Sequence, residues 1–176
     1  MAKSALLDWY GGKMLTAGVP APPIVLLDQH GSTFDVASLR GRRVLVFFYP
    51  KANTPGCTQQ ACAMRDVMAG TEGPWGAGLS ARARRGIAVV GVSPDAPSAQ
   101  AKFDAKYGLG YPLLCDTDHS VAESYGVWKE KSLYGKRYMG IERSAFLIDA
   151  DGVVEQAWYK ISPANTPVKL LEVLGA

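Results

Sequence analysis

The sequence has no long apolar run of the kind that crosses a membrane, and residues 1–14 lack the continuous hydrophobic stretch of a secretory signal. It also has little excess charge, since 19 basic and 16 acidic residues leave a net charge of +3 at pH 7. The short basic cluster Arg82-x-Arg84-Arg85 has no interleaved aromatic residues, so we interpret it as solvated surface. We therefore expect neither a membrane nor a nucleic acid as a partner.

Cysteine is scarce: the chain has three, Cys57, Cys62 and Cys115, and no Cys-x-x-Cys pair of the kind that disulfide oxidoreductases use. A phosphate-binding loop is also absent, because the glycine-rich stretch 68–78 has no lysine and no preceding strand in the right place. Without a secretory signal, we expect a cytoplasmic protein whose thiols stay reduced except during catalysis.

The 176 residues, 48% of them hydrophobic, suffice for one domain with a sizeable core. We predict strands over six segments rich in apolar residues: Ile24–Leu27, Val44–Tyr49, Ile87–Val92, Leu113–Cys115, Ser144–Asp149 and Val153–Tyr159. Helices are predicted over Cys57–Met68, Ser98–Tyr107, Ser120–Tyr125 and Thr166–Leu174. This order, with a hairpin turn at Asp149–Gly152, is typical of a thioredoxin-like α/β fold in which helices flank a central mixed β-sheet.

We assign residues 21–176 to this domain. Residues 1–20 contain Gly11, Gly12 and Gly18 and are expected to form an N-terminal extension. The sequence leaves open whether this extension is loosely held or binds a partner.

Cys57 lies where a thiolate would be stabilised. It follows the apolar segment Val44–Tyr49 and the chain-breaking Thr54-Pro55-Gly56, so it falls in the first turn of a predicted helix. Unpaired backbone N–H groups and the positive end of the helix dipole favour an anion there. An isolated cysteine near a strand end is more often a small buried hydrophobe, but this setting predicts a reactive thiol.

The pattern Pro50-x-x-x-Thr54-x-x-Cys57 resembles the active-site signature of peroxiredoxins, thiol peroxidases that reduce hydrogen peroxide and organic hydroperoxides. With Gln60-Ala61-Cys62, it resembles the subfamily called bacterioferritin comigratory protein or peroxiredoxin Q. The resemblance runs from about residue 21 to the C-terminus through Val90-Gly91-Val92-Ser93-Pro94-Asp95, Tyr111-Pro112-Leu113-Leu114, Tyr125-Gly126-Val127-Trp128 and Arg143-Ser144-Ala145-Phe146-Leu147-Ile148-Asp149. The chain departs from the family pattern at residues 68–78, a connection that is longer than in the family. We expect Trp75 to pack this connection against the rest of the protein.

Thiolate attack on one peroxide oxygen expels the other, so the site needs hydrogen-bond donors aimed at the departing oxygen. Thr54, the helix N–H groups and an arginine could supply them, and Pro50 could shape the loop and shield the thiolate. The resemblance implies that Arg143 is the cation that polarises sulfur and peroxide, a role in which lysine lacks the planar fork. Taken alone, Thr54 could be only a helix cap and Arg143 only a surface charge.

Attack on peroxide leaves Cys57 as a sulfenic acid, and Cys62 is the candidate resolving thiol. Five residues apart on an ideal helix, their Cα atoms would be roughly 8.7 Å apart, beyond the limit of ~7 Å for a disulfide. The helix must therefore unwind locally before they join. We interpret Cys115 as a buried structural cysteine. A rival grouping of all three cysteines with His119 as zinc ligands has a poor spacing.

Three functions are considered for a chain with this pattern of cysteines. The first is a thiol peroxidase of the two-cysteine, single-chain type, which thioredoxin or a similar reductant returns to the dithiol. The second is a disulfide oxidoreductase on the same fold, which the Cys57-x-x-x-x-Cys62 spacing disfavours. The third is a zinc-stabilised or redox-sensing interaction module. For the peroxidase we expect a peroxide substrate, no cofactor or metal, and a monomer, with a weak dimer as the alternative.

Overall fold

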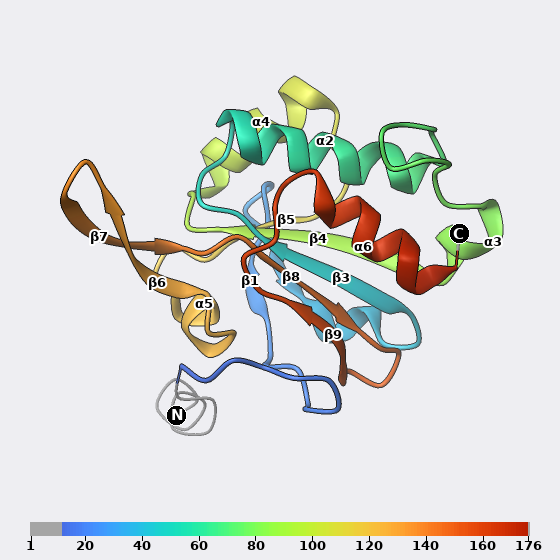
Figure 1. Cartoon of the computed structure of the whole chain (residues 1–176), viewed down its shortest axis with the longest axis horizontal. Helices are drawn as coiled ribbons and strands as arrows, with labels where there is room; N and C mark the ends of the chain where they lie inside the picture. The colour runs from blue at the N-terminus through green and yellow to red at the C-terminus, as the bar shows by residue number, and fades with distance from the viewer. Residues whose placement is uncertain (1–11, 176) are drawn as a thin grey trace.

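A seven-stranded mixed sheet forms the centre of the computed structural model, which describes residues 12–175 (Figure 1). Its strands are β1 (Val25–Leu27), β2 (Thr33–Asp35), β3 (Arg43–Phe48), β4 (Ile87–Ser93), β5 (Leu113–Cys115), β8 (Ser144–Ile148) and β9 (Val154–Trp158). They lie in the order β2-β1-β5-β4-β3-β8-β9. β3 pairs in parallel with β4 and antiparallel with β8, so it joins the parallel strands β4 and β5 to the antiparallel pair β8 and β9.

Helices cover both faces of this sheet (Figure 1). On one face lie α2 (Pro55–Ala69), α4 (Pro97–Tyr107) and α6 (Asn165–Leu174), and on the other lie α5 (Ser120–Ser124) and the 3-10 helix η1 (Val36–Leu39). Side chains of β3 alternate between the two cores, since Leu45 and Phe47 face α2 whereas Val46 and Phe48 face α5. None of the helices within residues 12–175 is both long enough and apolar enough to cross a membrane.

The predicted arrangement of a mixed sheet flanked by helices is confirmed. All six predicted strands and all four predicted helices are present, with ends that differ by at most two residues. The predicted hairpin turn joins β8 to β9, where Gly152 N–H donates to the Asp149 carbonyl at 3.1 Å. The sequence prediction does not include β2, η1, the short helix α3 (Ala81–Arg85), β6 (Trp128–Leu133) or β7 (Lys136–Ile141).

The strands β6 and β7 form a two-stranded hairpin that projects away from the sheet (Figure 1). Residues 132–139 are exposed, so the hairpin has no continuous apolar face by which a strand pattern could be recognised. Its turn is made by Tyr134 and Gly135, whose φ angles of 49° and 75° match a tight two-residue connection. β7 leads directly to Arg143, so the base of the hairpin adjoins the candidate site.

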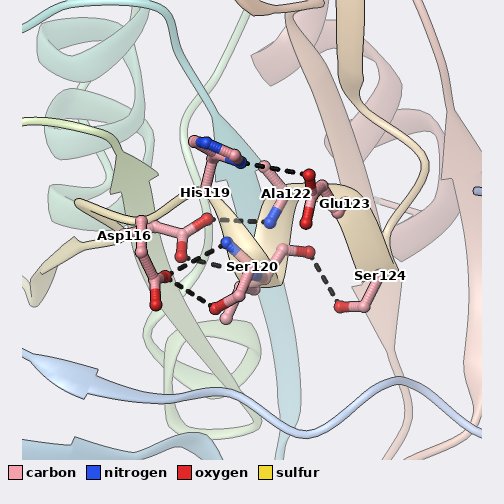
Figure 2. A network of polar contacts seen from close by, with 8 residues as sticks. Asp116, His119, Ser120, Ala122, Glu123 and Ser124 are labelled. Atoms are coloured by element: carbon pink, nitrogen blue, oxygen red, sulfur yellow. Dashed lines mark hydrogen bonds and ion pairs between the residues drawn. The ribbon is translucent and has the colours of Figure 1, made fainter. Parts of the chain in front are cut away.

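A polar network holds α5 against the end of β5 (Figure 2). The Asp116 carboxylate accepts backbone hydrogen bonds from Val121 at 3.2 Å and Ala122 at 2.8 Å. Burial raises the pKa of Asp116, and these two bonds oppose that effect.

His119 connects α5 to the hairpin. Its Nδ1 lies 3.2 Å from Glu123 Oε1, and its imidazole stacks on the Trp128 ring of β6 with centroids 4.1 Å apart. The network therefore fixes the base of the hairpin.

The segment before the sheet lies along β9. Leu15 is buried in the core on the α5 face, and Gly18 N–H donates to the Val154 carbonyl at 2.8 Å. Val154 N–H in turn donates to the Val19 carbonyl at 2.8 Å. Residues 1–11 of the predicted extension lie outside the described residues, and the boundary at residue 20 stays a prediction.

Candidate active site

Cys57 is the third residue of α2, at the end of the connection that follows β3. The helix begins at Pro55, where the missing N–H removes a donor that would have no helical acceptor. The Cys57 side chain is 1% exposed and belongs to the core between α2 and the sheet. Its predicted place in the first helical turn is confirmed.

Arg143 reaches this thiol from the connection between β7 and β8. Its Nη2 donates to Cys57 Sγ at 3.2 Å, and its main-chain carbonyl accepts from Ile161 N–H at 3.0 Å. A Cβ on Gly56 would lie 3.3 Å from Nη2 and 3.5 Å from Pro163 Cγ, so glycine leaves room for the guanidinium. A half-buried cation thus lies against the sulfur.

Gln60 fixes the orientation of that guanidinium, a role that is not predicted from the sequence. Its Oε1 accepts from Arg143 Nη1 at 2.7 Å, and its Nε2 donates to Thr166 Oγ1 at 2.8 Å. The Thr166 hydroxyl donates to the Ser162 carbonyl at 3.0 Å. Gln60 and Thr166 are 0% and 1% exposed, so water cannot replace these partners. The available sequence signal was the position of Gln60 three residues after Cys57, which places both side chains on the same side of the helix.

Thr54 and Pro50 lie half-buried in the connection between β3 and α2. Thr54 occupies the N-cap position, but its hydroxyl makes no capping bond and instead donates to the Lys51 carbonyl at 2.7 Å. The interpretation of the Thr54 side chain as a helix cap is therefore wrong, because its hydroxyl hydrogen-bonds within the loop before the helix and not to a helical N–H. Among Pro50, Thr54 and Arg143, only Arg143 hydrogen-bonds Cys57.

The same connection is anchored to the sheet and to α4. Ala52 N–H donates to the Asp95 carboxylate at 2.8 Å. Asn53, with a φ of 60°, accepts at Oδ1 from Tyr107 Oη at 3.1 Å and from Lys106 Nζ at 3.2 Å. These bonds hold the residues in front of Cys57 in one arrangement.

The three cysteines are free thiols in different surroundings. Cys62 lies half-buried on α2, where burial raises its pKa and the nearby Arg65 opposes that shift. Cys115 is buried on β5, and burial raises its pKa to about 11. Within residues 12–175 no three His, Cys, Asp or Glu side chains are grouped so as to hold a metal ion, which removes the support for the zinc grouping with His119.

A family model described as the AhpC/TSA family matches residues 17–157, most of the chain. The chain belongs to the AhpC/TSA family. Among its relatives, the peroxiredoxin Bcp of Escherichia coli (strain K12) is 44% identical over 151 residues, which cover 86% of this chain and 90% of that protein. The chain is thus a peroxiredoxin of the bacterioferritin comigratory protein or peroxiredoxin Q group, as the motifs around Cys57 suggest.

Solved structures of such peroxiredoxins share its fold. Xanthomonas campestris bacterioferritin comigratory protein, studied for its alkyl peroxide reduction activity, matches with a TM-score of 0.76 and 30% identity over 91% of this chain and 98% of that one. Peroxidoxin BcpB from Mycobacterium tuberculosis matches with a TM-score of 0.74 and 33% identity over 93% and 97%. The thioredoxin-like fold is confirmed, and the chain is a thiol peroxidase.

Replacing Gln60 by methionine should destabilise this peroxiredoxin by about 1–3 kcal/mol, because the buried Thr166 hydroxyl and the Arg143 guanidinium each lose a partner. Urea unfolding of the reduced protein measures this loss. Gln59→Met is the matched control, since Gln59 is exposed on the same helix. Equal unfolding free energies for the two variants would show that Gln60 does not hold the arginine.

Proposed function

We propose that Cys57 is the peroxidatic cysteine of this thiol peroxidase, that Cys62 of the same chain resolves its sulfenic acid, and that thioredoxin or a similar protein dithiol reduces the resulting disulfide. The observation that carries the proposal is the hydrogen bond of 3.2 Å from Arg143 Nη2 to Cys57 Sγ in the first turn of α2. It combines a cation with a helix N-terminus at one sulfur, and both favour a thiolate.

In the first step the Cys57 thiolate attacks one peroxide oxygen. A sulfur–oxygen bond forms, the oxygen–oxygen bond breaks, and the departing hydroxide or alkoxide takes a proton. Arg143 can donate to the charge that develops on this oxygen. The Thr54 hydroxyl donates to the Lys51 carbonyl, so its lone pairs can accept from the peroxide O–H and orient the substrate. Pro50 limits the access of water.

In the second step the Cys62 thiol displaces water from the Cys57 sulfenic acid, and a disulfide forms. The helix α2 is continuous from Pro55 to Ala69, so this step requires local unwinding between the two cysteines. Cys115 is the weaker candidate, because it lies buried on β5 with its Sγ against the Asp28 carbonyl at 3.8 Å. We therefore assign the resolving role to Cys62, which lies on the same helix as Cys57.

The site is complete within one chain, since Cys57, Cys62 and Arg143 all belong to it, and we therefore propose an active monomer. The peroxidatic thiolate acts without a cofactor or metal in this scheme. A cytoplasmic location fits these steps, because a reducing compartment keeps the free thiols available.

A peroxide-consumption assay coupled to thioredoxin and its reductase tests these steps. The unmodified protein should turn over repeatedly and form a Cys57–Cys62 disulfide, whereas Cys62→Ser should reduce about one peroxide per chain and then stop, because nothing recycles its sulfenic acid. Peptide mass mapping identifies the bond. A disulfide from Cys57 to Cys115 or to another chain, or sustained turnover by Cys62→Ser, would assign the resolving role elsewhere.

A further inference from the structure

A cavity of about 460 Å³ lies beside Cys62, between α2, α6 and the glycine-rich connection that follows α2. Cys62 forms part of its wall, and the other lining residues are mostly apolar, among them Ala63, Trp75, Pro167 and Val168. The peroxide-reducing step uses none of this surface, since Cys57 is buried on the sheet side of α2. The cavity therefore gives access to the second sulfur of the proposed disulfide.

Trp75 is held over this cavity by the connection that sets the chain apart from the family pattern. Gly73 and Gly76 exchange two backbone hydrogen bonds of 3.0 and 2.8 Å, and a Cβ on Gly73 would lie 2.5 Å from the Trp75 ring. Leu79 N–H donates to the Val67 carbonyl at 3.0 Å, which ties the connection to the last turn of α2. The half-buried Trp75 packs against the core, as the sequence predicts, and forms a fixed wall.

Most of the cavity wall should persist when α2 unwinds. Disulfide formation requires movement between Cys57 and Cys62, which includes Gln59 of the cavity wall, whereas Ala63 follows Cys62 and the connection that carries Trp75 is tied to the end of the helix. The opposite wall belongs to α6, a separate element. An apolar surface thus remains next to the Cys62 sulfur in the oxidised protein.

We propose that this cavity is the docking site of the protein dithiol that reduces the Cys57–Cys62 disulfide, with an apolar side chain beside the reductant's cysteine packing against Trp75. This inference rests on the proposed function. A thiol that attacks a disulfide must reach one of its sulfurs, and Cys62 is the one that lines an open cavity. A small polar thiol would gain little from these apolar walls, so the occupant is a protein.

The exchange is balanced in two steps. The reductant's first thiolate bonds to Cys62 Sγ, the Cys57–Cys62 bond breaks, and its electron pair leaves on Cys57 as a thiolate. When α2 rewinds, Arg143 hydrogen-bonds this thiolate. The reductant's second thiolate then attacks the reductant's first sulfur in this mixed disulfide, so that the reductant's own disulfide forms, the bond to Cys62 breaks, and the Cys62 thiolate leaves and takes a proton. The reductant loses two electrons, and the peroxidase dithiol is restored.

Stopped-flow reduction of the preformed disulfide tests the docking site. Trp75→Ala should slow reduction by thioredoxin about tenfold, as for loss of an aromatic anchor. It should leave reduction by dithiothreitol and oxidation by peroxide unchanged. Tyr134→Ala, at the hairpin tip where the side chain is 96% exposed, is the matched control and should have no effect. Val168→Lys places a charge on the opposite wall and should reproduce the loss without altering the connection.

Trapping identifies the sulfur that is attacked. Thioredoxin whose second cysteine is replaced by serine should form a mixed disulfide with Cys62. A mixed disulfide with Cys57, equal rates for Trp75→Ala and Tyr134→Ala, or equal slowing with dithiothreitol would overturn the docking site. Reduction by dithiothreitol but not by thioredoxin would overturn it as well and leave the peroxidatic role of Cys57 intact. A protein that peroxide does not oxidise would instead refute the proposed function.

Discussion

Replacing Cys57 by serine should abolish peroxide reduction while leaving the fold intact. The hydroxyl of serine is far less acidic than a thiol and cannot act as the nucleophile without a base, and the contacts described for Cys57 include an arginine but no base. Peroxide consumption under steady-state conditions measures the loss, and urea unfolding of the reduced protein measures the fold.

Cys115→Ser is the control for this result. Cys115 is also buried but lies on β5, with its Sγ against the Asp28 carbonyl at 3.8 Å. This variant should keep the rate of peroxide reduction. Rates near the unmodified value in Cys57→Ser, or loss of activity in Cys115→Ser, would show that the reactive thiol is not Cys57 of α2.

Replacing Arg143 by alanine should slow oxidation by peroxide about 10²–10³-fold, as for the loss of a donor to the transition state. The variant loses the guanidinium that lies 3.2 Å from Cys57 Sγ, so the sulfur also loses the cation beside it. Arg143→Lys should recover only part of the rate, because a single ammonium cannot donate to Cys57 and Gln60 in the same fork.

Two measurements separate these effects: the pH dependence of Cys57 alkylation and single-turnover oxidation by peroxide. Arg137→Ala is the control, since this exposed arginine of β7 pairs only loosely with Glu130, 3.5 Å away. An Arg143→Ala variant that matches Arg137→Ala in both measurements would show that Arg143 is an ordinary structural residue.

The sheet could be predicted because its central strands are apolar on both faces. Val44–Phe48 forms an unbroken run of buried apolar residues, and such a run is typical of a strand that is covered on both faces. The hairpin of β6 and β7 gives no such signal, because Lys129, Glu130 and Ser132 interrupt any alternation. Only its turn, Tyr134-Gly135, resembles a local hairpin sequence.

The candidate site was predictable where local sequence determines the geometry. The place of Cys57 in the first turn follows from Pro55, and the unbroken helix supports the requirement that α2 unwind before Cys62 can react. The position of Gln60 three residues after Cys57 indicates that it lies near the thiol, but its bond to Arg143, 83 residues later, becomes visible only when the chain is folded. The bond from Thr54 to Lys51 likewise depends on the actual course of the loop.

The most direct test is to identify the cysteine that peroxide oxidises first. The Cys62→Ser variant, fully reduced and treated with one equivalent of peroxide, is trapped with a cyclic 1,3-dione that reacts with sulfenic acids, and its peptides are mapped by mass. We predict that the label is found on Cys57 alone and that Arg143→Ala greatly slows its appearance. A label on Cys115, or none on Cys57, would contradict the assignment of the peroxidatic thiol.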